Sequence, residues 1–99
     1  MTEETSLVLA IFDQGVEPDV MEVLAEIGLE HYTKFADVSG VGETGQREGS
    51  PVWPGLNTLL LIVMPTGQVE RLVQRLHQVR DSFALKPGMK FIVTPARLL

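Results

Sequence analysis

The sequence predicts an α+β fold in the order β-α-β-β-α-β, with a long loop between the second and third strands. Two observations predict this order. Short apolar runs of strand length alternate with segments whose apolar residues recur every three or four positions. A segment rich in glycine and proline then separates two halves of similar length, and each half has the pattern strand, helix, strand.

The first half contains a strand, a helix and a second strand. The apolar run SLVLAIF, residues 6–12, is typical of a buried strand, and DQG ends it. A helix is expected next, because Pro18 lies near its start and Gly28 lies at its end. Its apolar face consists of Val20, Val23, Leu24 and Ile27, and the acids near its start are Glu17, Asp19 and Glu22, which suit the helix dipole. The segment HYTKFADV, residues 31–38, predicts a strand with mixed faces near an edge of the sheet.

The second half repeats this pattern after residue 55. The most apolar stretch of the chain, LNTLLLIVM at residues 56–64, predicts a second buried strand. A second amphipathic helix is predicted between the turn segments PTG and KPG. Its core-facing residues are Val69, Leu72, Val73, Leu76, Val79 and Phe83. The segment MKFIVTP, residues 89–95, predicts the last strand.

This order is that of the ferredoxin-like fold, an antiparallel four-stranded sheet with both helices on one face. We expect residues 1–99 to form a single such domain. The fold places the first and third strands in the centre, and these two strands lack polar alternation, as if both of their faces were buried. Because the two helices cover only one face, we expect further copies of the chain to cover the other in a closed homo-oligomer. The alternative is a monomer with an exposed apolar face, which proteins in water avoid.

Composition and charge restrict the class of protein. The absence of cysteine excludes disulfides and thiolate metal sites. No apolar run has the length of a membrane span, and the acidic start TEET differs from a signal peptide, so we expect a cytoplasmic protein without membrane insertion. The net charge of −5 argues against nucleic-acid binding. Residues 51–99 are nevertheless basic, with six bases and two acids, and this half can hold one small anion, although each base can equally solvate a helix face.

The segment GVGETGQREGSPVWPG, residues 40–55, holds five of the nine glycines and the only tryptophan. Its first six residues fit the spacing of a dinucleotide-binding turn, but that motif opens a helix, which Pro51 and Pro54 exclude. No Gly-Lys-Ser/Thr sequence of a Walker loop follows. A loop this long in a small domain is usually functional or disordered, and its glycine amides can hold an anion. Trp53 either anchors the loop to the domain or contacts a ligand or partner.

Groups for catalysis or metal binding are scarce. The two histidines, His31 and His77, have no nucleophile or paired carboxylate near them in the sequence, so we do not expect an enzyme. A metal site needs His31, Glu30 or His77 to come together from separate elements, and their spacing gives no signal of one.

The chain ends in KPGMKFIVTPARLL, in which a turn containing Gly88 leads through Lys90 into FIVTP. This ending and the order of elements resemble the PII signal-transduction superfamily, and most closely its divergent PII-like branch. In that family a Gly-x-Gly-Lys-like turn precedes a strand ending in proline. Residues 39–55 are similar in place to the family's T-loop, with VSGVGETG at its base and WPGLN at its return.

The resemblance implies a non-enzymatic, trimeric sensor of the nitrogen regulatory type. It implies a small anionic effector, an adenine nucleotide such as ADP, ATP or AMP, in clefts between subunits. The ligand-binding residues that it implies are Gly40, Val41, Gly42, Glu43, Thr44, Lys86, Gly88, Met89 and Lys90. A protein partner, for example a membrane transporter, is expected to contact the loop through Gln46, Arg47, Glu48 and Trp53.

Two departures from the family pattern bear on this expectation. The loop has no tyrosine that could be modified, and only Arg97 stands where the family has several phosphate-binding arginines, which disfavours ATP-type binding through many phosphate contacts. A function of another class therefore stays open. The alternative is a trimeric, divalent-metal-responsive protein of the copper-tolerance-related fold, with metal bound through His31 or His77.

Overall fold

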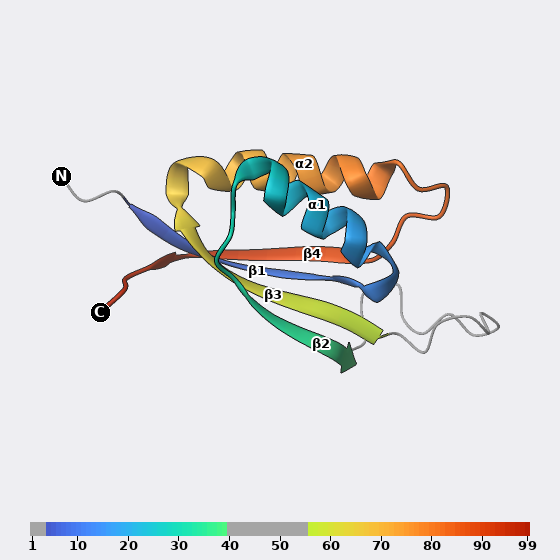
Figure 1. Cartoon of the computed structure of the whole chain (residues 1–99), viewed down its shortest axis with the longest axis horizontal. Coiled ribbons are helices and arrows are strands. Elements are labelled where there is room, and N and C mark those ends of the chain that lie inside the picture. The colour runs from blue at the N-terminus through green and yellow to red at the C-terminus, as the bar shows by residue number, and fades with distance from the viewer. Residues whose placement is uncertain (1–3, 40–55) are drawn as a thin grey trace.

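The computed structural model describes residues 4–39 and 56–99, which form one four-stranded antiparallel sheet in the order β2-β3-β1-β4. Both helices lie on one face of this sheet (Figure 1). The strands are β1 (Thr5–Asp13), β2 (Thr33–Ser39), β3 (Leu56–Pro65) and β4 (Met89–Ala96), and the helices are α1 (Glu17–Ile27) and α2 (Val69–Asp81). The ferredoxin-like β-α-β-β-α-β fold predicted from the sequence is thus confirmed.

The ends of α1 follow from local sequence. Pro18 stands in the first turn, where a missing N–H costs no helical hydrogen bond. Gly28 ends the helix with φ of 85°, a left-handed conformation that glycine adopts without strain. The amide of Leu29 donates to the carbonyl of Leu24 at 2.9 Å and closes the last turn. The chain then reverses towards β2, which places α1 against the sheet.

The core lies between the sheet and the helices. Every second residue of β1 and β3 is buried there, as is the inner face of each helix. These core residues are Val8, Ala10, Phe12, Val16, Val20, Val23, Leu24, Leu60, Ile62, Met64, Leu72 and Leu76. The predicted apolar faces of both helices therefore pack against the core, except for Phe83 and for Val73, which is only partly buried.

The opposite side of the sheet, which we call the open face, is also apolar. Its apolar residues are the alternate positions of the central strands and their neighbours in register: Leu7, Leu9, Ile11, Leu59, Leu61, Val63, Ile92 and Phe35. The two central strands are only partly covered on this side, and Ile92 and Phe35 are 47% and 46% exposed. No helix among the described residues lies over the open face (Figure 1).

Two predicted boundaries need correction. Helix α2 ends at Asp81, and at this end the Ser82 hydroxyl donates to the carbonyl of Val79 at 2.6 Å, which satisfies one of the last helical carbonyls. Phe83 therefore lies beyond the helix and is 37% exposed, so its predicted place in the core is wrong. Strand β2 begins at Thr33 and not at His31, and its pairing with β3 shifts between Phe35 and Val38.

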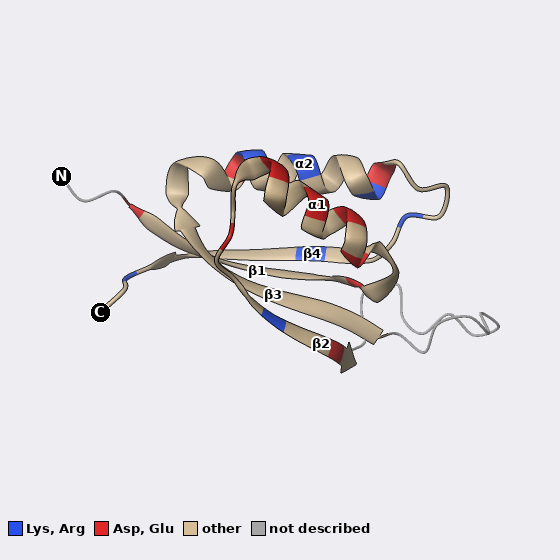
Figure 2. Ribbon diagram, viewed as in Figure 1, with Lys and Arg blue, Asp and Glu red and all other residues tan. Residues whose placement is uncertain are grey.

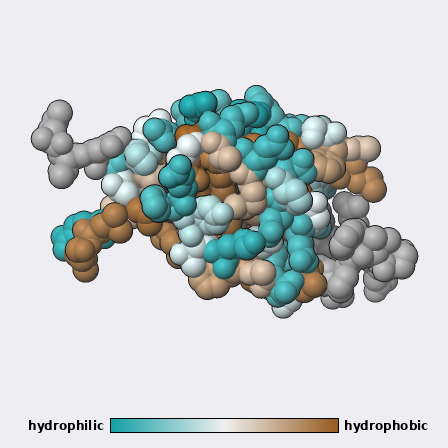
Figure 3. Space-filling model, viewed as in Figure 1, coloured by the Kyte–Doolittle hydropathy of each residue, from teal (hydrophilic) through white to brown (hydrophobic). Residues whose placement is uncertain are grey.

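The helix layer presents charged groups, acidic along α1 and of both signs along α2 (Figure 2). In Figure 3 this view is largely hydrophilic, with hydrophobic atoms gathered at the C-terminal segment and at the turn after α2. The exposed residues there include Leu98 and Leu85. No helix in residues 4–39 or 56–99 is long and apolar enough to cross a membrane.

We predict that Leu76→Ala lowers the free energy of unfolding by about 2–5 kcal/mol, because it leaves a cavity beneath a helix in a fully buried site. Urea unfolding followed by circular dichroism measures this loss. The matched control is Leu85→Ala, whose side chain is 79% exposed and whose effect we expect to stay within about 0.5 kcal/mol. Equal losses for the two variants contradict the position of the core.

Candidate functional site

The candidate site lies at one end of the sheet, where the turn between α2 and β4 meets the ends of the other strands. Met89 at the start of β4 pairs with Phe12, and the next position of β1, Asp13, pairs with Asn57 of β3. Strand β2 ends and β3 begins at this same end (Figure 1). The structure thus places the start of β4 at the sheet end from which residues 40–55 depart.

The predicted site residues divide into two groups. Lys86, Gly88, Met89 and Lys90 are described and lie together in the turn and the first residues of β4. The other nine positions lie outside the described residues; they are Gly40, Val41, Gly42, Glu43, Thr44, Gln46, Arg47, Glu48 and Trp53.

Gly88 fixes the turn to the sheet through its backbone. Its carbonyl accepts a hydrogen bond from the amide of Asp13 at 3.0 Å. The carboxylate of Asp13 in turn accepts from the amide of Gly15 at 2.8 Å. A Cβ at Gly88 would meet no atom of the described residues within 4 Å, so these residues leave space beside the turn for a group that approaches from solvent.

Met89 and Lys90 lie on opposite faces of β4, as neighbouring strand residues must. The Met89 side chain packs against the core, so any contact with a ligand falls to its backbone. Lys90 is opposite Ile11 in register and therefore belongs to the open face. It is exposed, and none of the described carboxylates forms an ion pair with it.

Lys86 is a more weakly held cation. Its ammonium lies 3.6 Å from a carboxylate oxygen of Asp81, and its side chain is 63% exposed. The pKa of Asp81 is lowered mainly by a hydrogen bond from Arg80, and Lys86 adds a smaller effect. Such an exposed pair is screened by water and stabilises little, so Lys86 is free to turn towards another anion.

A buried polar contact on the helix side of the sheet was not predicted from the sequence. The Thr58 hydroxyl, which is fully buried, donates to Oε1 of Glu17 at 2.7 Å. The ammonium of Lys34 lies 3.3 Å from Oε2 of the same carboxylate. Three elements, α1, β2 and β3, are joined here. The pKa of Glu17 is lowered chiefly by the Thr58 hydrogen bond and then by Lys34, against the opposing effect of burial.

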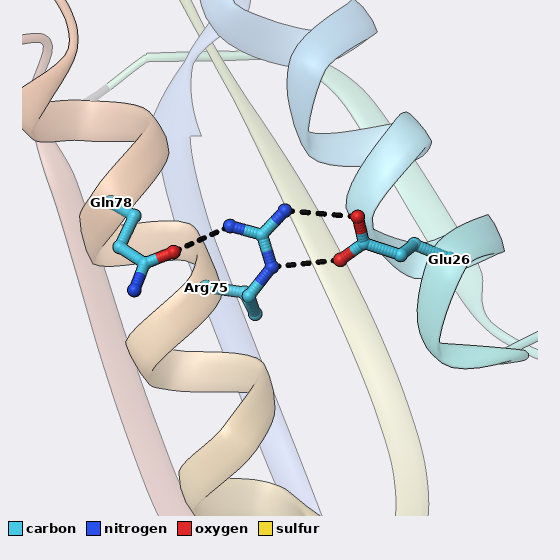
Figure 4. Close-up of polar contacts among 3 residues, drawn as sticks. All are labelled: Glu26, Arg75 and Gln78. Carbon is cyan, nitrogen blue, oxygen red and sulfur yellow. Dashed lines mark hydrogen bonds and ion pairs between the residues drawn. The ribbon is translucent and has the colours of Figure 1, made fainter.

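A second polar contact joins the two helices on their outer surface (Figure 4). The Arg75 guanidinium donates to both carboxylate oxygens of Glu26, at 2.7 and 3.0 Å, and to the side-chain oxygen of Gln78 at 2.6 Å. The Arg75 hydrogen bonds lower the pKa of Glu26. This two-point contact orients α2 against α1 and lies in the helix layer, away from the open face.

A sequence model of the family described as nitrogen regulatory protein P-II matches residues 5–96. The chain belongs to the P-II family. Members of this family are typically homotrimeric regulators that interact with partner proteins, and they are generally not enzymes. No curated protein matches the sequence closely enough to be informative.

Solved structures share the P-II fold at low sequence identity. CPII of Thiomonas intermedia K12, a nitrogen regulatory PII-like protein bound to ADP, AMP and bicarbonate, has a TM-score of 0.67 and 15% identity, over 94% of this chain and 88% of its own. Arabidopsis thaliana PII bound to citrate has a TM-score of 0.70 and 21% identity, over 95% and 78%. A DUF3240 family protein of Shewanella baltica OS155 has a TM-score of 0.70 and 20% identity, over 100% and 96%. These likenesses confirm the fold.

The described part of this P-II chain contains no group of three His, Asp or Glu side chains that could hold a metal ion. His31 is exposed before β2, and the ring of His77 packs edge-on against Phe91, with ring centroids 5.4 Å apart. A hollow of about 790 Å³ lies between the two chain ends and is lined by Ser6, Thr66 and Arg97 among others. Since this is the far end of the sheet, the hollow is separate from the predicted site.

We predict that Thr58→Val destabilises the protein at pH 7 by about 1 kcal/mol, because Glu17 loses a hydrogen bond to its charged form. The folded-state pKa of Glu17 is below its ordinary value of 4.5, so its contribution is fully present above that value. The contribution is lost as the pH falls through the folded-state pKa. Urea unfolding at a series of pH values measures the difference between variant and wild type, which should shrink in acid.

The control for this prediction is Thr58→Ser, which keeps the hydroxyl and should retain the pH dependence of the wild type. A Thr58→Val penalty that is constant from neutral to acidic pH contradicts the assignment to Glu17.

Proposed function

We propose that this chain is a non-enzymatic regulatory protein that assembles as a homotrimer and binds an adenine nucleotide in the clefts between subunits. The nucleotide is ADP, AMP or ATP, and the signal passes to a protein partner through residues 39–55. The observation that carries the proposal is the position of Lys90 at the end of the sheet where that loop departs, on the open face and without an ion pair to any carboxylate in residues 4–39 and 56–99.

The open face supports assembly. Three neighbouring strands contribute aliphatic side chains to it, and no element among the described residues covers them. A contiguous apolar surface of this kind marks an interaction site in proteins that are surrounded by water. Because the chain belongs to the P-II family, we take the partner on this face to be a further copy of the same chain. In a closed arrangement of three copies, each copy covers the apolar faces of the others.

The chemistry of the turn supports an anionic ligand. Among the described residues, no carboxylate forms an ion pair with Lys90, Lys86 is weakly held, and no atom lies within 4 Å of the place that a Cβ of Gly88 would take. Lysine ammonium groups bind phosphate as point charges, and backbone amides of the turn add hydrogen bonds. The PII-like protein CPII is bound to ADP, AMP and bicarbonate, which supports an adenine nucleotide as the ligand. Residues 40–44 from the base of the loop and residues 86 and 88–90 from the turn form the proposed site.

The charge at the described part of the site favours the smaller nucleotides. Lys90 supplies one full positive charge, and Asp81 shares that of Lys86. Between one and two positive charges match AMP or ADP better than a triphosphate. We therefore expect ADP and AMP to bind more tightly than ATP.

The proposed output is contact with a protein partner. The tip of the loop, residues 46–48 together with Trp53, is the proposed contact, and a membrane transporter is the kind of partner that the family resemblance implies. A nucleotide at the base of the loop favours the loop conformation with which it makes the better contacts. Such a difference in affinity between two conformations is what a ligand-controlled switch requires.

We predict that ADP and AMP release or absorb heat on binding and raise the melting temperature, and that Lys90→Met weakens this binding roughly 10- to 100-fold through loss of a charged hydrogen bond. Isothermal titration calorimetry and thermal shift measure both effects. Lys86→Met is the graded control and should weaken binding less. The absence of heat and of a thermal shift with all of ATP, ADP and AMP would rule out the nucleotide.

We predict a trimer in native mass spectrometry and its loss in Leu9→Asp, because Leu9 lies at the centre of the open face and a carboxylate there is buried on assembly. Circular dichroism should show that the variant stays folded, since Leu9 does not face the helices. Leu85→Asp, which adds the same charge at an exposed turn, should leave the trimer intact. A wild-type protein that is monomeric at all concentrations contradicts the proposed assembly.

A further inference from the structure

The two edge strands of the sheet, β2 and β4, are held to the domain in different ways. Met89 and Phe91 of β4 pack against the core, and the Phe91 ring also contacts that of His77. No residue of β2 belongs to the core or to the apolar side chains that pack against it. Val38 is half-buried, and every other residue of β2 is exposed. Apolar burial therefore fixes β4 and contributes little to the attachment of β2.

The backbone pairing of β2 is also interrupted. Residues 33–35 pair with residues 59–61 of β3, and residues 38–39 pair with residues 56–57. Between these two short pieces Asp37 adopts φ of 57°, a conformation that costs free energy in a residue with a side chain. Since β2 lies at the edge of the sheet, it has a neighbouring strand on one side alone within the described chain (Figure 1). Its hydrogen bonds are thus fewer and less regular than those of a central strand.

A polar contact joins β2 to the helix side of the sheet. Lys34 is opposite Leu60 in register, and its ammonium lies 3.3 Å from Oε2 of Glu17 at the start of α1. The other carboxylate oxygen accepts a hydrogen bond at 2.7 Å from the hydroxyl of Thr58, which is buried. The carboxylate is therefore already positioned by α1 and β3 when Lys34 meets it. The described residues form no other ion pair or side-chain hydrogen bond between β2 and the rest of the domain.

We infer that β2 separates from the sheet on its own while the rest of the domain stays folded, and that the contact of Glu17, Lys34 and Thr58 limits how often it does so. We call this contact the clasp. Elements with few buried apolar contacts and solvent-exposed backbone hydrogen bonds open locally at a lower free energy than the core. The clasp opposes this opening through a charged hydrogen bond. The inference goes beyond the proposed function and does not depend on it.

Separation of β2 changes two surfaces at once. Phe35 is opposite Leu59 on the open face, and Ser39, the last residue of β2, directly precedes residue 40. Release therefore withdraws Phe35 from the open face and moves the point at which residues 40–55 begin. A copy of the chain packed on the open face would contact Phe35 and oppose release, so release and assembly would weaken each other by linkage. This consequence alone rests on the proposed assembly.

Native-state hydrogen exchange of the full chain, followed for single amides by NMR, measures the release. After correction for intrinsic rates, we expect the amides that β2 donates to β3 to exchange at least about tenfold faster than the amides that β1 donates to β3. Their exchange should respond only weakly to low concentrations of urea, because local opening exposes little surface. The amides of β1 should show the full urea dependence of global unfolding.

Two variants test the clasp. Lys34→Met removes the ammonium, and Glu17→Gln removes the charge but keeps an oxygen that accepts from Thr58. Each should speed the exchange of β2 by about two- to fivefold relative to β1, the range for an exposed ion pair. The double variant should be no faster than either single variant, because both remove the same interaction. Glu26→Gln is the matched control on the same helix: it weakens the contact with Arg75 and should leave the exchange of β2 unchanged.

Protection of β2 equal to that of β1, or the same urea dependence for both, would mean that β2 opens only with the whole domain, and this overturns the release. Equal acceleration of every strand by Glu17→Gln, or no effect of Lys34→Met on β2, overturns the clasp. Neither residue lies on the open face and no nucleotide is added, so these failures leave the proposed function intact. Absence of a trimer or of ADP binding overturns the proposed function and leaves the release standing.

Discussion

The alternation of side chains along β1 and β3 is the constraint on which this structure depends, because both of the alternating sets are apolar. Even-numbered residues from Val8 to Phe12 and from Leu60 to Met64 meet the helices. Odd-numbered residues from Leu7 to Ile11 and from Leu59 to Val63 form the open face. The helices in residues 4–39 and 56–99 cover the first set only. The open face is therefore the surface on which the proposed further copies of the chain would pack.

Polar side chains mark the limits of the buried layer and hold its register. Among the described residues, Ser6 and Thr58 are the buried polar side chains, one near each end of the central strand pair. The Ser6 hydroxyl bonds to that of Thr66 at 2.7 Å, and Thr58 bonds to Glu17. A shift of one residue in strand pairing would move both hydroxyls away from these partners and exchange the two apolar sets. The hydrogen bonds therefore specify a register that apolar contact alone would leave ambiguous.

Most of the fold could be predicted from local sequence, since strand length, helical spacing and the glycines and prolines at element ends all agree. The end of α2 could not, because Phe83 continues the apolar spacing of the helix although the helix ends at Asp81. The contact of Glu17 with Thr58 was also beyond local patterns, since it joins positions 41 residues apart and depends on how α1 crosses β3. Of the predicted site, the structure brings together Lys86, Gly88 and Lys90 and turns the Met89 side chain into the core. The binding role of all these residues stays a prediction, and the residues of the loop lie outside those that the structure describes.

The two edges of the sheet have a consequence for how copies can add to it. In β2, Asp37 adopts φ of 57° at the break in pairing, so the outer row of backbone amides is not a regular template. In β4, Pro95 has no amide hydrogen to offer a strand that adds beyond it. Edges of this kind oppose unlimited strand-by-strand growth into a ribbon or fibril. A chain with an apolar sheet face is thereby directed towards small, finite assemblies and away from aggregation.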